Sequence, residues 1–507
     1  MTTAQIFIMI AIVIYLVAML GVGVWFAKKN NSVDDFYLGG RKLGPFVTAM
    51  SAEASDMSSW LLMGLPGVAY LTGLAEASWT AIGLAVGTYL NWLIVARRLR
   101  RYSTRLDAIT VPQFFSKRWG DEKNLLSAIA AVIIMIFFVP YLASGFSACG
   151  KLFGTLFGMD YVAAMVISAA VIVLYTVMGG FMAASFTDLI QSIIMTVALI
   201  IVLCFGVTKA GGMDAVLTNA QSMAGYLSLS QIHNPATGGA DPYGFLTVCS
   251  LLAWGLGYFG MPHILVRFMA IEDEKKLTLS RRVATIWVVI SMAVAVFIGV
   301  VGNGMTKAGT LEQLADAETI IVRVASLISE HGVVAALLAG IILAGILAAT
   351  MSTADSQLLA ASSSVSQNLM AEFFKVKMDG KKSMLFARGT MIVISLIAMF
   401  LARDPNSSVF RVVSFAWAGF GATFGPPVLF ALFWKRSNKQ GILAGLIAGG
   451  AMVFIWKFGI AKLGGAFAIY ELLPAFLTAS IVIVVVSLLT PKPDAEIERV
   501  FDEMKRK

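Results

Sequence analysis

Long apolar segments separated by short polar stretches follow one another along almost the whole chain. A helix needs about 20 apolar residues to cross a bilayer. The first segment ends at Lys28-Lys29 without a cleavage site, so it predicts a retained anchor rather than a signal peptide. The pattern predicts an all-α polytopic membrane protein with about thirteen spans, near residues 5–27, 45–69, 77–96, 125–148, 161–182, 189–208, 244–266, 284–304, 333–360, 386–402, 410–434, 441–458 and 470–489.

The composition excludes a soluble enzyme. Hydrophobic residues make up 58% of the 507 residues and charged residues only 13%, whereas soluble domains are about 45–50% apolar and about 25% charged. The chain also lacks a G-x-x-x-x-G-K-[ST] phosphate-binding loop, so it has no motif for an ATP-driven pump. We therefore expect an ion gradient to drive any uphill transport.

Basic residues predict how the chain crosses the membrane. Lysine and arginine gather in every second loop, which is the positive-inside pattern. It places the N-terminus outside and the tail inside, in what we expect to be a bacterial inner membrane. The same placement explains the net charge of +9 without a nucleic-acid partner, and no obligate protein partner is indicated. The basic loops lie at residues 28–42, 97–123, 267–282, 375–382 and 435–439.

Two spans contain segments poorly suited to a lipid-facing helix. Residues 51–59 place Glu53 and Asp56 inside the second span, where an ionised carboxylate costs at least ~3 kcal/mol. Residues 254–263 combine three glycines, each lowering helix stability by roughly 1 kcal/mol, with Pro262, which removes a backbone donor. We expect a polar break lining a cavity in the first and an unwound, ligand-facing segment in the second. A loop at the membrane edge and simple close packing are the alternatives.

Two later segments are also unusual. Residues 348–357 carry four hydroxyl side chains among alanines. These hydroxyl groups either line a binding site or donate hydrogen bonds to carbonyls of their own helix. Residues 415–427 contain several glycines and end in two prolines, which predict a hinge or gate.

The order of the spans predicts two related halves. Spans 2–6 and 7–11 are blocks of five, so they insert with opposite orientations, and each begins with an interrupted helix. Inverted repeats of this kind hold a binding site near the bilayer midplane, between broken helices. The expected units are residues 1–44 (extra helix and cytoplasmic loop), 45–208 (first repeat), 209–434 (outer loop and second repeat), 435–490 (two extra helices) and 491–507 (cytoplasmic tail).

Five motifs resemble the sodium/solute symporter family, most of all its sodium/proline branch. They are DFYLGGR at 35–41, ASDMS at 54–58, WLLMGLPG at 60–67, WGLGYFG at 254–260 and PHIL at 262–265. The resemblance extends over nearly the whole chain. It implies a LeuT-type five-plus-five inverted repeat, with one extra helix before it and two after it. It also implies sodium-coupled uptake of L-proline by alternating access.

The resemblance also implies residue roles. Sodium would bind the carbonyls of Ala54, Met57 and Ala349 and the hydroxyls of Ser352 and Thr353, and oxygen ligands suit a small hard cation. Asp56 would support sodium affinity, either directly or by orienting the break. Arg41 and Asp188 would act on the cytoplasmic side in coupling or release, unless they are ordinary loop charges. The proline site would be lined by Ser58, Tyr141, Trp254, Tyr258 and Pro262.

Glu53 departs from the family pattern, which has glycine at this position. The added carboxylate could bind a proton, pair with a cytoplasmic arginine or tune ion choice; a water-exposed position in the inner vestibule is the simplest expectation. Two other functions stay open. One is symport of another small solute, such as pantothenate, a monocarboxylate or a sugar. The other is a transporter-like membrane sensor.

Overall fold

The computed structural model describes residues 2–27, 32–377 and 379–505, so the Lys28-Lys29 pair lies outside the described residues. Helices dominate, and a small antiparallel sheet pairs β1 (Gln231–His233) with β2 (Ala240–Pro242). The longer helices are α1 (Thr3–Ala27), α5 (Leu74–Leu90), α8 (Leu125–Phe157), α9 (Tyr161–Lys209), α13 (Leu277–Lys307), α15 (Val333–Ser363), α16 (Gly380–Leu401), α17 (Val409–Phe433), α18 (Lys439–Phe458) and α19 (Leu472–Leu489).

Shorter helices connect and cap these. They are α2 (Val33–Leu38), α3 (Pro45–Ser59), α4 (Leu65–Thr72), α6 (Arg97–Arg105), α7 (Val111–Arg118), α10 (Met213–Ser222), α11 (Phe245–Leu252), α12 (Pro262–Ala270), α14 (Ile320–Ser329) and α20 (Ala495–Lys505). The 3₁₀ and π segments are η1 (Gly39–Arg41), η2 (Trp60–Gly64), η3 (Asn91–Ala96), η4 (Ala253–Gly260), η5 (Glu274–Lys276), η6 (Ala317–Thr319), η7 (Ser364–Phe373), η8 (Ile460–Leu463) and η9 (Gly465–Phe467).

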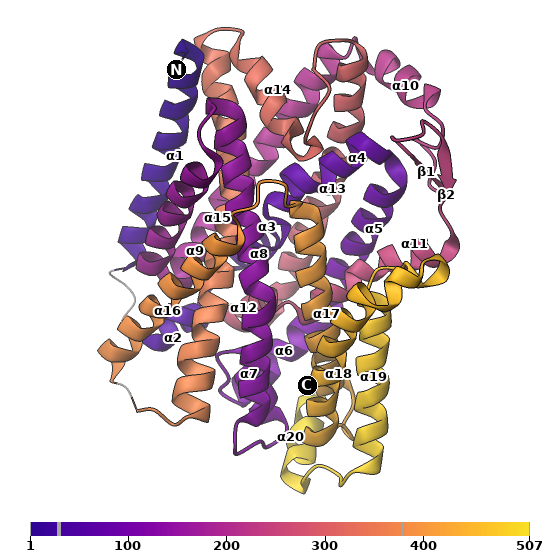
Figure 1. The fold of residues 1–507 in the computed structure, drawn as a ribbon. Helices are drawn as coiled ribbons and strands as arrows, with labels where there is room; N and C mark the ends of the chain where they lie inside the picture. Colours follow the sequence, from indigo (N-terminus) through magenta and orange to yellow (C-terminus); the bar gives the residue numbers. More distant parts are fainter. Residues whose placement is uncertain (1, 28–31, 378, 506–507) are drawn as a thin grey trace.

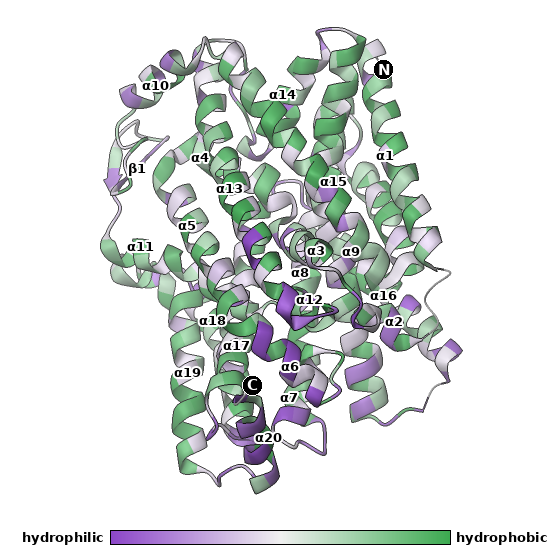
Figure 2. Cartoon of the chain, turned by 180° about the vertical axis from the view of Figure 1, so that it is seen from behind, coloured by the Kyte–Doolittle hydropathy of each residue, from purple (hydrophilic) through white to green (hydrophobic). Residues whose placement is uncertain are grey.

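The outer surface of the helical bundle is apolar. Among the described residues, 10 helices are long and apolar enough to cross a membrane, or up to 11 if the bent pair 245–260 and 262–270 is one span. Large side chains such as Ile14, Ile286 and Ile481 are more than half exposed on α1, α13 and α19. These helices are predominantly hydrophobic in Figure 2, whereas hydrophilic residues gather at α6 and α20. The chain is a multi-pass membrane protein.

Helix α9 contains two of the predicted spans and has a kink close to their boundary. The two spans expected at 161–182 and 189–208 form one helix of 49 residues, interrupted at Gly180 (φ 65, ψ −170). A straight helix of this length would measure about 74 Å at 1.5 Å per residue, more than twice the ~30 Å thickness of the hydrocarbon core. Glycine allows the positive φ that breaks the helix direction.

The break in the second span is narrower than the sequence predicts. Helix α3 includes all of residues 51–59, and the one non-helical residue inside it is Ser58 (φ 49, ψ −171). The π segment η2 and helix α4 follow at once. The polar stretch is therefore mostly helical and buried, with the discontinuity at its end.

The seventh span bends rather than unwinds. The residues of η4 form a 3₁₀ helix, and Met261 after it is extended (φ −77, ψ 108). Helix α12 then continues at an angle of 48° to the preceding helical segment, residues 245–260. A Cβ atom on Gly257 would lie 1.9 Å from Nε1 of Trp417, so glycine permits η4 to approach α17 closely. Helix α17 runs without interruption through Pro426 and Pro427, so the hinge expected there is not a break in the helix.

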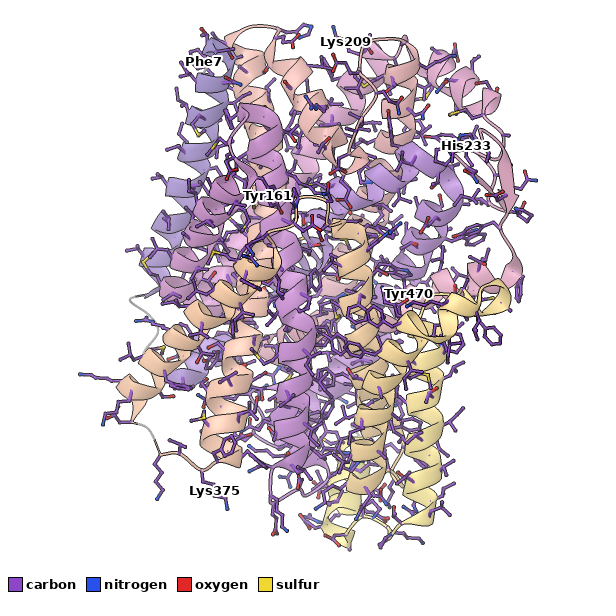
Figure 3. The ribbon with its side chains drawn as sticks, viewed as in Figure 1. Phe7, Tyr161, Lys209, His233, Lys375 and Tyr470 are labelled. Carbon is purple, nitrogen blue, oxygen red and sulfur yellow. The ribbon has the colours of Figure 1, made fainter. Side chains whose placement is uncertain are left out.

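Helix α15 occupies the middle of the bundle, where it packs against α1, α3, α8 and α9 (Figure 1). Residues 348–357 lie in its buried part and are helical throughout. The N-terminal end of α1 and the helices α10 and α14 lie at one end of the molecule, and α7 and α20 lie at the other. Lys209 and His233 mark the first end and Lys375 the second in Figure 3.

Candidate substrate and cation site

Four oxygen atoms from α3 and α15 meet about one turn before the break at Ser58. The Ser352 hydroxyl donates to the Ala54 carbonyl at 2.8 Å and lies 3.2 Å from the Ala349 carbonyl. The Thr353 hydroxyl donates to the same Ala349 carbonyl at 3.1 Å. All four residues are buried. We call Ala54 O, Ala349 O, Ser352 Oγ and Thr353 Oγ1 the oxygen cluster.

Met57, expected with these residues, forms no hydrogen bond with the oxygen cluster in the described part of the chain. Its carbonyl accepts the backbone N–H of Trp60 instead. The oxygen cluster has the chemistry of an alkali-cation site, because hydroxyl and carbonyl oxygens keep lone pairs free after making one hydrogen bond. The cluster joins the second span to the centre of α15.

Asp56 connects the break in α3 to the bent seventh span. Its Oδ2 atom accepts a 2.5 Å hydrogen bond from the Tyr258 hydroxyl in η4. Its backbone carbonyl accepts from the Tyr141 hydroxyl of α8 at 3.2 Å. Asn91 donates to the Tyr258 carbonyl at 3.0 Å and fixes η4 from the other side. Three predicted site residues therefore form one hydrogen-bonded unit.

Aromatic rings gather around Trp254, which precedes Tyr258 by four residues in η4. The Trp254 ring lies 5.7 Å from Trp60, 5.8 Å from Phe410 and 5.0 Å from Tyr470, measured between ring centroids. The Trp60 and Phe410 rings also stack, at 5.8 Å. We call Trp60, Trp254 and Phe410 the aromatic layer. The sequence indicated only Trp254 of these three as a site residue, because Trp60 and Phe410 read as ordinary apolar side chains.

The remaining predicted substrate residues differ in their surroundings. Ser58 lies at the break, where its hydroxyl accepts the Trp60 N–H at 3.1 Å. Pro262 begins α12 and lines a separate narrow cavity of about 20 Å³ together with His263 and Arg267. Ser58 therefore lies beside the aromatic layer, whereas Pro262 borders a different space.

A buried ion pair lies on the other side of α3. Arg267 of α12 donates to Asp188 of α9 at 3.0 Å, to the Ser51 hydroxyl at 2.7 Å and to the Ser356 hydroxyl at 2.5 Å. Ser51 in turn donates to Asp188 at 2.6 Å. Arg267 and Asp188 are 1% and 0% exposed. Arg267 is therefore not part of the basic loop predicted at 267–282, and the alternative that Asp188 is an ordinary loop charge is excluded. The sequence could have indicated this, because Arg267 lies within a run of apolar residues and Asp188 lies within an apolar helix.

Arg41 lies apart from the oxygen cluster, in η1. Its guanidinium donates to the carbonyls of Met269 and Ala108, each at 2.7 Å, and so ties the end of α12 to the loop before α7. Burial, with the nearby Arg100 charge, lowers the pKa of Arg41 from its usual value. Within the described residues no hydrogen bond or ion pair joins Arg41 to Asp188: Arg41 contacts the Met269 carbonyl of α12, and Asp188 contacts the Arg267 side chain.

Glu53 is buried, so the expectation that it faces water is wrong: the residue is 1% exposed. Its Oε1 atom accepts from Thr88 at 2.9 Å and from Trp92 at 2.8 Å. Its Oε2 atom has no hydrogen-bond partner in the described residues, and no arginine there forms an ion pair with Glu53. Proton binding and ion selection stay predictions for this residue.

Comparison with known proteins places this arrangement in a family. Residues 36–449 match the family model described as the sodium:solute symporter family. The chain belongs to that family. It is 42% identical to the osmoregulated proline transporter OpuE of Bacillus subtilis over 98% of each chain. It is 41% identical to the sodium/proline symporter of Haemophilus influenzae, over 98% of this chain and 97% of the other.

The fold agrees with the sodium:solute symporter assignment. A solved Na⁺-coupled sialic acid symporter, in a substrate-bound outward-open state, superposes with a TM-score of 0.79 at 19% identity, covering 96% of this chain and 99% of the other. The LeuT-type fold expected from the resemblance is thereby confirmed, and the chain is a transporter and not an enzyme.

Proposed function

We propose that this sodium:solute symporter is a secondary active transporter that takes up L-proline together with Na⁺ by alternating access. The observation that carries the proposal is the oxygen cluster, which joins the broken second span to α15. Relatives that match over nearly the full length are proline transporters by name. A cation bound between two helices shifts a conformational equilibrium only if its affinity differs between the states.

We propose that Na⁺ binds the oxygen cluster, with the Met57 carbonyl as a further ligand in the loaded state. Two carbonyls and two hydroxyls supply the uncharged oxygens that a hard cation accepts. Asp56 lies two residues from Ala54 and contributes negative charge to the same region. Ion binding would replace the hydrogen bonds from Ser352 and Thr353 to their carbonyl partners.

The proposed proline site comprises Ser58, Tyr141, Trp254, Tyr258 and Pro262. Aromatic walls suit a pyrrolidine ring, because each buried CH₂ contributes about 0.8 kcal/mol. The aromatic layer would close over the substrate. Arg41 and Asp188, through their different contacts with the α12 region, would couple this closure to the cytoplasmic side.

We propose thirteen spans with the N-terminus outside and the C-terminus in the cytoplasm of a bacterial cell. Ten apolar helices, the bent pair and the broken α3–η2–α4 element give twelve, and the break at Gly180 divides α9 into two spans. The five units expected from the sequence, 1–44, 45–208, 209–434, 435–490 and 491–507, follow from this count. The central ten spans form the inverted repeat.

Uptake into proteoliposomes tests the function. We expect radiolabelled proline to accumulate when an inward Na⁺ gradient is imposed, and not when K⁺ replaces Na⁺. Unlabelled proline should compete, whereas pantothenate, lactate and glucose should not. Uptake that ignores the Na⁺ gradient would refute the coupling, and displacement by pantothenate but not proline would change the substrate.

A substitution in the aromatic layer separates substrate binding from ion binding. We expect Trp254→Ala to raise the KM for proline between tenfold and a hundredfold, because losing a well-packed large apolar side chain removes about 1.5–3 kcal/mol. The sodium concentration for half-maximal uptake should change less than twofold. Trp287→Ala, on α13, is the matched control and should leave the KM unchanged. An unaltered KM in Trp254→Ala would place the proline site elsewhere.

A further inference from the structure

The two helices that follow the proposed inverted repeat bring an aromatic residue to Trp254. Helices α18 and α19 are joined by residues 459–471, which include η8 and η9. Tyr470 lies near the end of this connection and is labelled in Figure 3. Its ring stacks on the Trp254 ring, with 5.0 Å between the centroids and 19° between the planes. A segment outside the ten central spans therefore contacts a wall of the proposed proline site.

Four aromatic rings of the described residues contact Trp254, and Tyr470 is the nearest and the most nearly parallel of them. The centroids of Trp60 and Phe410 lie 5.7 and 5.8 Å from that of Trp254, with tilts of 33° and 46°. Trp417 lies 6.4 Å away with a tilt of 28°. Stacked rings with centroids about 4.5–7 Å apart attract each other beyond the effect of their buried area. Tyr470 therefore has the geometry to determine the orientation of the Trp254 ring.

Tyr470 is itself held by three neighbouring helices. Its hydroxyl donates to the Ser414 carbonyl of α17 at 2.7 Å. Its backbone N–H donates to the Ser250 hydroxyl of α11 at 3.4 Å. The next residue, Glu471, forms an ion pair of 2.9 Å with Lys457 of α18. The Tyr470 ring is therefore fixed relative to α11, α17 and α18, and it offers Trp254 a rigid surface to stack on.

The backbone and the ring of Trp254 are held from different parts of the chain. The indole N–H of Trp417 in α17 donates to the Trp254 carbonyl at 2.8 Å. The hydrogen bond fixes the backbone, whereas the stacked Tyr470 fixes the ring. A side chain that is already ordered before a ligand arrives loses less conformational entropy on binding, so pre-ordering raises affinity. Loss of the Tyr470 ring would leave the backbone of Trp254 in place and free its ring.

We propose that Tyr470 is a positioning residue for proline binding, because it holds the Trp254 ring in the orientation in which that ring forms a wall of the proline site. Tyr470 acts through Trp254 and does not itself touch the substrate. The residues that determine proline affinity therefore extend beyond the ten central spans into the connection 459–471. This role rests on the proposed function, since it requires that Trp254 lines the proline site.

Proline uptake into proteoliposomes by variants of Tyr470 tests this role. We expect Tyr470→Ala to raise the KM for proline about threefold to tenfold, which is the range that the loss of one aromatic pair corresponds to. The maximal rate at equal protein abundance and the sodium concentration for half-maximal uptake should each change less than about twofold. Tyr470→Leu, which is apolar but has no ring, should behave like Tyr470→Ala and replaces it if the alanine variant folds poorly.

Two further variants separate stacking from other effects. Tyr470→Phe keeps the ring and loses only the hydrogen bond to Ser414, so its KM should lie within about twofold of the wild-type value. Phe467→Ala is the matched control: Phe467 is an exposed ring in the same connection, and its centroid lies 6.3 Å from that of Trp456. Its removal should leave the KM unchanged.

A double-mutant cycle shows whether Tyr470 acts through Trp254. When Trp254→Ala is already present, Tyr470→Ala should raise the KM by less than about twofold more. Three results overturn the role of Tyr470 and leave sodium-coupled proline transport intact: independent effects of the two changes, a KM in Tyr470→Phe as high as in Tyr470→Ala, or a lower maximal rate in Tyr470→Ala with an unchanged KM. Absence of sodium-dependent proline uptake by the wild type overturns the proposed function instead.

Discussion

The variant Asp56→Asn should need at least tenfold more sodium than the wild type for half-maximal proline uptake. The change keeps the size of the side chain but removes its charge beside the oxygen cluster and weakens its 2.5 Å hydrogen bond with Tyr258. Hydrogen bonds to charged groups contribute about 1.5–3 kcal/mol, which corresponds to roughly ten- to a hundredfold in affinity. Uptake measured over a series of Na⁺ concentrations, at equal protein abundance, gives the value.

Asp214→Asn is the matched control, because Asp214 lies exposed in the first turn of α10, far along the chain from the break. Its sodium dependence should equal that of the wild type. Ser352→Ala, which removes one oxygen of the cluster itself, should shift the sodium dependence in the same direction as Asp56→Asn. Wild-type sodium dependence in both Asp56→Asn and Ser352→Ala would show that the ion binds elsewhere.

Breaking the buried ion pair should have the largest effect on stability. In Arg267→Gln the Asp188 carboxylate loses its cationic partner, and removing one partner of a buried pair costs about 3–5 kcal/mol. We expect a lower thermal unfolding midpoint in detergent and a reduced yield of folded protein. Asp188→Asn should behave similarly, because Arg267 then loses the carboxylate with which it forms its ion pair.

A double-mutant cycle distinguishes pairing from loss of packing. Arg267→Gln combined with Asp188→Asn should be more stable than the sum of the two single effects predicts, since neither charge is left unpaired. The exposed pair of Lys276 and Glu272 is the control, and Lys276→Gln should cost about 1 kcal/mol or less. Additive single effects at Arg267 and Asp188 would mean that the two side chains do not act as a pair.

Much of the architecture can be predicted from the sequence, because apolar length and the positions of glycine and proline act locally. The broken second span and the bent seventh span are both visible as polar or glycine-rich interruptions. The hydroxyl side chains of residues 348–357 are visible in the sequence, but the role of the oxygen cluster was implied only by the family resemblance. Their meeting depends on how α3 packs against α15, which no local pattern expresses.

The errors share a physical cause, namely charges that are buried by distant partners. The sequence predicts that Glu53 faces water in the inner vestibule, because it does not show that Thr88 and Trp92 donate hydrogen bonds to the carboxylate. The sequence predicts Arg267 as part of a basic loop, because its ion-pair partner Asp188 lies 79 positions away in the chain.

The conformation of Ser58 limits which residues can replace it. Its backbone conformation (φ 49, ψ −171) belongs almost only to glycine, and a side chain there stores about 1–3 kcal/mol of strain. Its hydroxyl meanwhile accepts the N–H of Trp60. Glycine would relieve the backbone strain but would remove the hydroxyl acceptor. Alanine would keep the strain and would also lack the acceptor. The position is a compromise that neither smaller residue can reproduce.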